Sequence, residues 1–443
     1  MKWLSLTGPG GVLAAAGAVV RGGSDDSDEG LFGFITELKL INFAWLTVLA
    51  SVGLSLVGVY AIDVAEQPIA QAAMAPTAAK QLAFLFIGVL AAGMIALPHV
   101  RVLGWVAWPV FAICIGLLVF MLVPAVPAWL VTPRNGARAW INLGVVDFQP
   151  SELTKIAYIL VVAHYLRFRH QHRRFAGLLI PGLITAVPVG LITVQPDLGT
   201  ASLFGPALFA VLIAAGARVR HLLLIVVLAL AIAPAVYPFL QPHQKQRLVG
   251  MMAQFTGDQS TAQGINYQSF TAQDLIGSGG WTGRPDAAAR ALVRHNRLPE
   301  AHNDMIFAVI CARFGMLGGL GVLALYGLWL AGALLTAAAC REPMGRLIAV
   351  GLAAFVGAQV VINVGMNIGI VPIIGITLPF ISYGGSSMVT CWLMAGLVMS
   401  CGLHKARPPF RESFDYSDDD PGWDRKPNDY GRRMHVSGRV LTR

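Results

Sequence analysis

The chain has 443 residues and a formal net charge of +9; apolar residues make up 56% of it and charged residues only 12%. The charged share is about half of that in soluble domains, and the mean hydropathy of +0.65 argues against a soluble enzyme. The composition therefore indicates a polytopic membrane protein. The five cysteines have no metal-ligand spacing and are odd in number, so we expect packing residues and not a disulfide framework.

The two ends of the chain are predicted to lie outside the membrane domain. An apolar stretch at 12–20 faintly resembles a signal peptide, but it is short, Gly-rich and followed by an acidic patch at 24–29. We therefore expect residues 1–40 to form a disordered cytoplasmic extension. Residues 405–443 are polar, with Pro, Gly, Asp and Arg, and we expect a disordered cytoplasmic tail.

Ten apolar spans separate these ends. They are 41–62, 81–98, 102–125, 150–166, 177–194, 200–216, 222–240, 304–336, 348–370 and 385–403. Basic residues follow each even-numbered span: Arg101; Arg167, Arg169, Arg173 and Arg174; Arg218 and Arg220; Arg341 and Arg346; Lys405 and Arg407. Because cytoplasmic loops carry an excess of Lys and Arg, we predict an all-α polytopic membrane protein with about ten transmembrane helices and both termini in the cytoplasm. The positive charge is then largely a topology signal, and we expect no nucleic-acid partner.

The longest outer loop, 241–303, breaks this charge pattern. It carries Lys245, Arg247, Arg284, Arg290, Arg294 and Arg297. Long loops translocate largely regardless of charge, so these residues could be neutral in function. They could equally attract an anionic ligand such as a lipid pyrophosphate. The sequence leaves both interpretations open.

Three charges precede the fourth span. Arg138, Glu152 and Lys155 come before the apolar run 156–163, and ionisable groups at the edge of hydrocarbon usually mark a functional site. Pro150 suits the first position of a helix, which places Glu152 in the first turn and Lys155 one turn away on the same face. This spacing predicts a charged pocket at the mouth of a helix. The alternative is an interfacial anchor beside an ordinary helix-terminal charge.

A second segment, 195–200, places Asp197 at the membrane edge on the predicted outer side. Pro, Asp and Gly are ordinary turn residues, so this signal is weak by itself. Its position on the same side as the three charges makes Asp197 a candidate.

A third segment, 298–307, carries Glu300, His302 and Asp304 at the start of the eighth span. A carboxylate at an apolar boundary suits proton abstraction, so Asp304 is a candidate general base. Asp is also a favoured N-cap residue, and the sequence alone does not separate the two roles.

A fourth segment, 372–387, is punctuated by Gly and Pro and contains Ser382, Ser386 and Ser387. Irregular backbone at membrane depth must be buried in protein or line a cavity. The hydroxyls and N–H groups could bind an anionic or sugar group, or the segment could be a plain re-entrant turn. No Walker loop, dinucleotide motif, nucleophile elbow or His/Cys metal cluster occurs in the sequence.

In this order and on this topology, the four segments resemble the shape, elongation, division and sporulation family, whose members include RodA and FtsW. The resemblance covers about residues 40–404, and its strongest stretches are 363–372 and 378–387. The context of Met366 is slightly closer to RodA than to FtsW. The resemblance implies a domain at 41–404 in the bacterial cytoplasmic membrane that polymerises lipid II on the outer face.

The resemblance also implies roles for the residues. The 4-hydroxyl of one disaccharide attacks the anomeric carbon of a chain held on undecaprenyl pyrophosphate. The family's general base corresponds to Asp304, which would take the hydroxyl proton, while cations neutralise the leaving pyrophosphate. The expected substrate-binding residues are Arg138, Glu152, Lys155, Asp197, His302, Ser382, Ser386 and Ser387.

Two positions depart from the family pattern. The usual His-Thr-Asp-Phe is His302-Asn303-Asp304-Met305 here. A Glu-Glu pair that normally follows is replaced by Ala312-Arg313. If either glutamate supports catalysis or packing, this chain must compensate or have an altered activity. A degenerate paralogue therefore stays an alternative.

The implied partners are lipid II, an undecaprenyl-pyrophosphate-linked glycan, a class B penicillin-binding transpeptidase and membrane proteins of the elongation or division machinery. The sequence requires no cofactor, although carboxylates at the outer rim are compatible with Mg²⁺. The competing functions are a lipid II flippase and a non-catalytic scaffold for the transpeptidase. The ionisable residues gather at the outer rim and not at mid-membrane, which favours the enzyme. The choice between elongation and division stays open.

Overall fold

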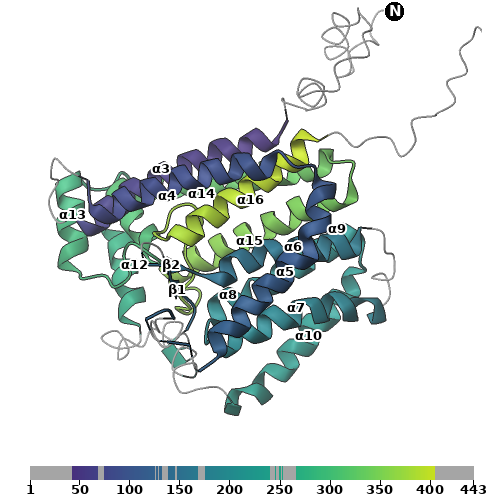
Figure 1. The fold of residues 1–443 in the computed structure, drawn as a ribbon. Coiled ribbons are helices and arrows are strands. Elements are labelled where there is room, and N and C mark those ends of the chain that lie inside the picture. The colour runs from purple at the N-terminus through teal and green to yellow at the C-terminus, as the bar shows by residue number, and fades with distance from the viewer. Residues whose placement is uncertain are drawn as a thin grey trace, which may run out of the picture. The chain divides into compact units, whose positions relative to one another are not determined.

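The computed structural model describes residues 42–67, 74–124, 126–127, 129–131, 138–144, 147–167, 175–239, 245, 249–250, 252 and 266–404. The predicted extension 1–40 and tail 405–443 lie outside these residues. Figure 1 shows a bundle of helices packed side by side. Eight helices among the described residues are long and apolar enough to cross a membrane, which confirms the predicted class of polytopic α-helical membrane protein.

Each predicted span coincides with helical structure. The helices are α3 (Ala44–Glu66), α4 (Pro76–Ala96), α5 (Val100–Leu122), α6 (Pro150–Leu166), α7 (Leu179–Val194), α8 (Leu198–Ser202), α9 (Phe204–Ala215), α10 (Val219–Val236), α14 (Ile306–Ala339), α15 (Pro343–Asn367) and α16 (Gly385–Leu403). Short 3-10 turns, η2 (Phe175–Leu178) and η3 (Tyr237–Phe239), precede α7 and follow α10. Helix α6 has 17 residues and α10 has a shorter apolar part, Val219–Ala229, so these two are not among the eight.

The structure adds elements that the hydropathy pattern did not reveal. The second half of the predicted outer loop is helical, with α12 (Tyr267–Gly279) and α13 (Asp286–His295). Two short antiparallel strands, β1 (Ile141–Asn142) and β2 (Asp147–Phe148), precede α6. None of these segments forms a long apolar run, and segments this short are marginally stable in isolation, so tertiary contacts stabilise them.

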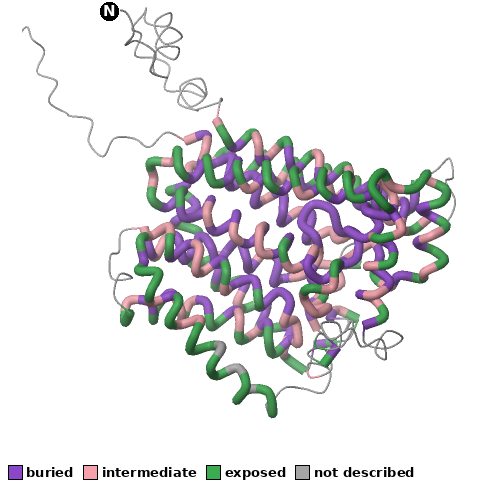
Figure 2. The backbone as a smooth tube through the Cα atoms, turned by 180° about the vertical axis from the view of Figure 1, so that it is seen from behind, coloured by how far each residue is buried: buried purple, intermediate pink, exposed green. Residues whose placement is uncertain are grey.

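Helices α6 and α15 form the centre of the bundle. Helix α15 packs against α14, α9, α6 and α16, and nearly every residue of α6 is buried. Figure 2 shows these buried segments inside, with exposed residues on the peripheral helices. The exposed faces of α4, α5, α7 and α10 are rich in Leu, Ile, Val and Phe, as expected for helices that face lipid.

Two glycines permit backbone contacts that a side chain would block. A Cβ on Gly396 of α16 would come within 2.5 Å of the carbonyl oxygen of Ala92, so α16 and α4 pack backbone to backbone. Helix α14 is broken at Gly315, which has φ +69° and ψ −168°. The turn between α12 and α13 enters this break, where the Met316 N–H donates to the Gly280 carbonyl over 2.8 Å.

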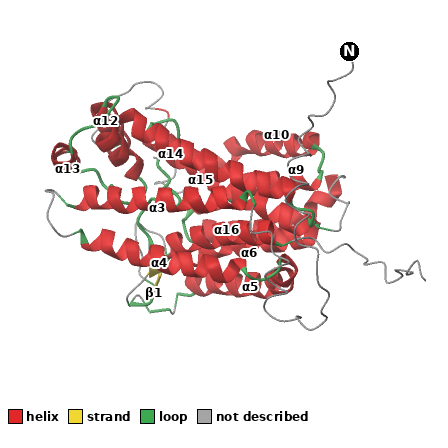
Figure 3. Cartoon of the chain, turned by 90° about the horizontal axis from the view of Figure 1, so that it is seen from above, coloured by secondary structure: helices red, strands yellow, loops and turns green. Residues whose placement is uncertain are grey.

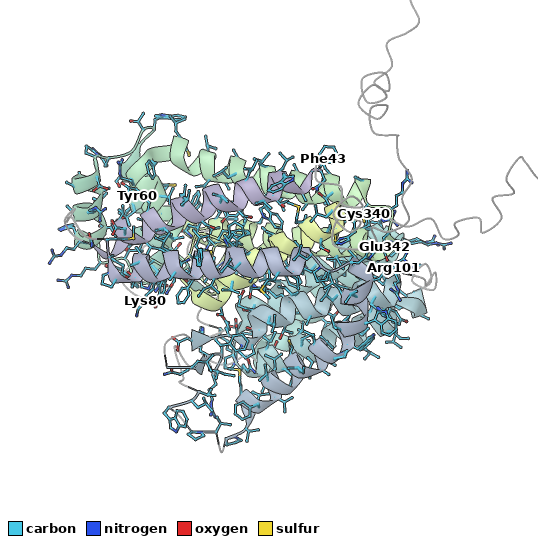
Figure 4. All side chains as sticks on the ribbon, turned by 45° about the horizontal axis from the view of Figure 1, so that its top comes forward. Phe43, Tyr60, Lys80, Arg101, Cys340 and Glu342 are labelled. Atoms are coloured by element: carbon cyan, nitrogen blue, oxygen red, sulfur yellow. The ribbon has the colours of Figure 1, made fainter. Side chains whose placement is uncertain are left out.

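The helix ends sort into two groups, as an alternating topology requires. At one end, the Arg101 guanidinium lies 3.5 Å from Glu342, and the His99 and His404 rings are 4.8 Å apart. Figure 4 shows Arg101, Glu342 and Cys340 together at this end, with Lys80 toward the other. At that other end, α12 and α13 gather where α3 ends and α14 begins (Figure 3). All five cysteines are free, as expected for packing residues.

Candidate functional site

The start of α6 has the geometry that its sequence predicts. Pro150 occupies the first turn and Glu152 is the acidic residue there. The Lys155 ammonium donates to Glu152 Oε1 over 2.9 Å, and the two side chains are only 1% and 5% exposed. Lys155 Nζ also donates to Gln359 Oε1 on α15 over 3.3 Å. A buried ion pair is tolerated when further hydrogen bonds satisfy it, and Gln359 supplies one.

Arg138 is not part of this pair. Its guanidinium Nη2 donates to the Val126 carbonyl over 3.2 Å. It makes no hydrogen bond or ion pair with Glu152 or Lys155 among the described residues. The structure therefore brings two of the three predicted charges into contact and leaves the third in the loop before β1.

Asp197 is attached to the same region through a neighbouring amide. It is the N-cap of α8, and its Oδ1 accepts the Thr200 N–H over 3.0 Å. Its Oδ2 accepts from Gln149 Nε2 over 3.2 Å, and Gln149 is the N-cap of α6. Burial raises the pKa of Asp197, although the Thr200 N–H opposes this shift. Asp197 and the Glu152 pair are thus joined through the cap of α6.

Asp304 lies on a turn whose backbone is held by α15. The carboxylate residue is 7% exposed, and its carbonyl accepts from Asn363 Nδ2 at 2.8 Å and Asn367 Nδ2 at 3.0 Å. Helix α14 begins at Ile306 with Met305 as its N-cap. Asp304 therefore precedes the cap position, and simple helix capping does not explain it.

The fourth segment clamps the two residues before Asp304. Ser382 Oγ donates to the Asn303 carbonyl over 2.6 Å and accepts from the Leu378 N–H. The Tyr383 N–H donates to the His302 carbonyl over 2.9 Å. With the Asp304 carbonyl held by α15, three consecutive carbonyls of the turn are hydrogen-bonded. The Ser382 hydroxyl thus donates its proton to one backbone carbonyl and accepts from one backbone N–H.

Gln81 of α4 holds the bend that leads into α16. Its side-chain amide is fully buried, donates to the Ser382 carbonyl over 2.9 Å and accepts from the Gly384 N–H over 3.1 Å. Ser386 and Ser387 follow in the first turn of α16. They lie beside the first N–H groups of this helix, which carry positive partial charge and attract anions.

A polar ladder on α15, formed by Gln359, Asn363 and Asn367, connects these parts. The four-residue spacing places all three side chains on one face of the helix. Gln359 contacts Lys155, and Asn363 donates to the Ile376 carbonyl over 2.7 Å as well as to the turn before α14. None of the site residues predicted from the sequence lies on this helix. Amides repeated at helical spacing inside an apolar span were the available signal.

The departure from the usual Glu-Glu pair has a local explanation. Ala312 is fully buried, while Arg313 Nε donates to the Tyr60 hydroxyl over 2.9 Å and lies 3.5 Å from Asp286 Oδ1. Arg290 Nε donates to Asp286 Oδ2 over 2.8 Å, so this carboxylate serves two guanidinium groups. Arg313 is therefore paired with a carboxylate, and its charge is balanced locally.

Arg290, one of the basic residues of the predicted outer loop 241–303, has a structural role. It is 4% exposed, and its Nη2 lies 2.7 Å from Asp63 Oδ2 at the end of α3. This cation therefore attaches α13 to the bundle. Arg284, Arg294 and Arg297 are exposed, and Lys245 and Arg247 lie in the part of the loop that is described only at isolated positions. Within the described residues no group of three or more His, Cys, Asp or Glu side chains could hold a metal ion.

Curated proteins from several bacteria are similar to this chain in sequence. The peptidoglycan glycosyltransferase MrdB of Escherichia coli K12 is 35% identical over 303 residues, which are 68% of this chain and 79% of MrdB. The stage V sporulation protein E of Bacillus subtilis is 31% identical over 73% of this chain and 86% of its own length. A probable peptidoglycan glycosyltransferase FtsW of Xanthomonas oryzae is 35% identical over 65% of this chain and 58% of that protein.

Solved structures match as well. One, described as structural coordination of polymerization and crosslinking by a peptidoglycan synthase complex, has 32% identity and a TM-score of 0.66 over 80% of this chain and 96% of that chain. The rod shape determining protein RodA of Thermus thermophilus has 30% identity and a TM-score of 0.57 over 80% of this chain and 95% of its own. The family of cell cycle proteins FtsW, RodA and SpoVE matches residues 41–407. The predicted resemblance is thereby confirmed, and the chain belongs to the FtsW, RodA and SpoVE family.

Proposed function

We propose that this chain is a membrane peptidoglycan glycosyltransferase that polymerises lipid II, in cell shape or cell division. The relatives named peptidoglycan glycosyltransferase and the match to a peptidoglycan synthase complex support this activity. The observation that carries the residue assignment is the buried Asp304 on a turn with three hydrogen-bonded carbonyls. A general base must be held in position, and this turn holds it from two sides.

In the proposed step, Asp304 accepts the proton of the 4-hydroxyl of the acceptor sugar. The oxygen attacks the anomeric carbon of the donor chain, and the bond from this carbon to the pyrophosphate breaks with its electron pair. Lys155 and the N-terminus of α16 supply positive charge for the leaving pyrophosphate. The polar ladder of α15 connects Lys155 to the turn of Asp304, which supports one joint site.

We also propose roles for five more of the predicted site residues. Asp197 is proposed to bind substrate beside the cap of α6, and Ser386 and Ser387 to bind at the first turn of α16. Ser382 is proposed to position the turn, because backbone groups occupy its hydroxyl. Arg138 is proposed to contact substrate from the loop before β1.

We further propose ten membrane-crossing helices, with α6 and α10 added to the eight long ones. Both termini would lie in the cytoplasm of the bacterial inner membrane, and α12, α13 and the candidate site on the outer face. The two groups of helix ends support this topology, because Arg101, which follows the second span, lies beside Glu342, which follows the eighth, at the end away from the site. A class B penicillin-binding transpeptidase is the proposed partner, as suggested by the polymerization and crosslinking complex.

The test is synthesis of glycan from labelled lipid II by the chain purified with its cognate transpeptidase. We expect polymer that persists in moenomycin and falls about 100-fold or more in Asp304→Asn, the range lost with a general base. Asp274→Asn, a change at an exposed carboxylate on α12, is the matched control and should retain full activity. A folded, partner-bound wild-type complex that makes no polymer would refute the proposal.

A further inference from the structure

We propose that Glu66, the last residue of α3, is a positioning residue that acts through His302, and that His302 carries the proton away from the general base. This role rests on the function proposed above. It adds a residue from a helix that none of the four sequence segments includes.

The two side chains form a defined pair. Glu66 Oε1 lies 2.9 Å from His302 Nδ1. The His302 ring is edge-on to the Tyr383 ring, with the centroids 5.8 Å apart, and the Tyr383 N–H holds the His302 carbonyl. A carboxylate at Nδ1 favours the tautomer with its proton there, which leaves Nε2 as the atom that can exchange a proton. Nε2 makes no hydrogen bond with any described residue.

The proposed reaction needs such a group. Once the new glycosidic bond has formed, the acceptor proton is on Asp304 and the electron pair of the broken bond has left with the pyrophosphate. Asp304 must lose this proton to water before the next addition, yet it is only 7% exposed. His302 is two residues away on the same turn, and its side chain is 32% exposed. As the more exposed of the two side chains, His302 is the proposed route by which the proton reaches water, through Nε2.

A second carboxylate on this segment lacks the same relationship. Glu300 is exposed, and its side chain accepts a hydrogen bond from the Asn303 amide. No hydrogen bond or ion pair joins it to His302 among the described residues. Glu300→Gln is therefore a matched control for Glu66→Gln, because both changes remove one carboxylate charge near the turn.

The test is the steady-state rate of lipid II polymerisation by the complex with its transpeptidase. We expect His302→Ala to lower kcat about tenfold or more while KM changes less than about twofold, and added imidazole to restore part of the rate. Glu66→Gln should lower kcat severalfold in the wild-type background and cause no further loss in His302→Ala. Glu66→Asp, which keeps the charge on a shorter side chain, should fall between Glu66→Gln and the wild type.

Several results would overturn the role of Glu66 and His302. One is a double variant, Glu66→Gln with His302→Ala, whose loss of kcat is the product of the two single losses. Another is a loss of kcat in His302→Ala that imidazole does not reduce. A third is an equal loss of kcat in Glu66→Gln and Glu300→Gln. Unfolding temperatures of each variant separate a folding defect from a kinetic one, and Glu66→Asp serves if Glu66→Gln does not fold. Inactive wild-type protein would overturn the proposed function itself, whereas active wild-type protein with those results overturns only the role of this pair.

Discussion

Removing one member of the buried pair Glu152–Lys155 should destabilise the protein far more than removing both. Lys155→Met replaces the ammonium by a thioether of similar length and leaves the Glu152 carboxylate without its cation. Glu152→Gln together with Lys155→Met replaces both charges. Because both charges are removed together, the double variant leaves no uncompensated charge at this position, where most residues of the helix are buried.

The magnitude follows from the geometry. Two unit charges 2.9 Å apart attract each other by about 6 kcal/mol at an effective dielectric constant of about 20. Removing one partner of a buried pair costs about 3–5 kcal/mol, and Lys155→Met also deletes the hydrogen bond to Gln359, worth about 1 kcal/mol. The double variant should lie within about 2 kcal/mol of the wild type, so it should be more stable than Lys155→Met by about 2–4 kcal/mol.

The assay is thermal or denaturant unfolding of the purified chain in detergent, followed by polymerisation of labelled lipid II. The double variant should fold and yet lose most of its polymerisation, because the cation for the pyrophosphate is absent. If Lys155→Met unfolds at the same temperature as the wild type, the reasoning from burial is wrong. If the stable double variant polymerises normally, Lys155 has only a structural role.

Three further predictions concern single positions. Gly315→Ala should destabilise the protein by about 2–5 kcal/mol, because φ is +69° and a Cβ would lie 2.4 Å from the Trp281 carbonyl oxygen. Gly93 has open space around it, so Gly93→Ala should unfold like the wild type. Asp197→Asn should keep the cap of α8. Because burial raises the pKa of Asp197, this variant should be at least as stable as the wild type at neutral pH. Asp197→Ala removes the cap and should lower the free energy of unfolding by about 1 kcal/mol. Burial would raise the pKa of Asp286, but hydrogen bonds from Arg290 and Tyr60 lower it overall. The ionised Asp286 therefore stabilises the folded protein above the unfolded pKa of about 4, and this stabilisation is lost as the pH falls below that value.

Each of these predictions has a contrary result. Equal unfolding temperatures for Gly315→Ala and Gly93→Ala would show that the break in α14 tolerates a side chain. A large loss of stability in Asp197→Asn would show that its charge, and not its cap, stabilises the turn. The unfolding temperature of Asp286→Asn should fall less steeply than that of the wild type as the pH is lowered toward 3; an unchanged slope would contradict the pKa argument.

Local features of the chain could be predicted because they depend on neighbours in the sequence. Apolar runs of about 20 residues predict helices, since a buried backbone in lipid must satisfy its own hydrogen bonds. Pro150 and the three-residue spacing of Glu152 and Lys155 predicted both the start of α6 and the contact between the two charges. Segment 372–387 was expected to be buried in protein or to line a cavity because its backbone is irregular at membrane depth, and its residues 376–382 are mostly buried.

The tertiary structure decided which residues far apart in the sequence become hydrogen-bond or ion-pair partners. Gln81 is 301 residues from Ser382, and Lys155 is 204 residues from Gln359, so no local pattern relates them. Arg313 stands where the family pattern has a glutamate, and the fold pairs it with residues of α3 and α13. A buried polar group needs a hydrogen-bond partner wherever the fold can supply one. The sequence by itself therefore determined the long apolar helices and proposed Asp304 as the candidate base, while only the packing of α15, α4 and α3 decided which side chains hold the turn that carries it.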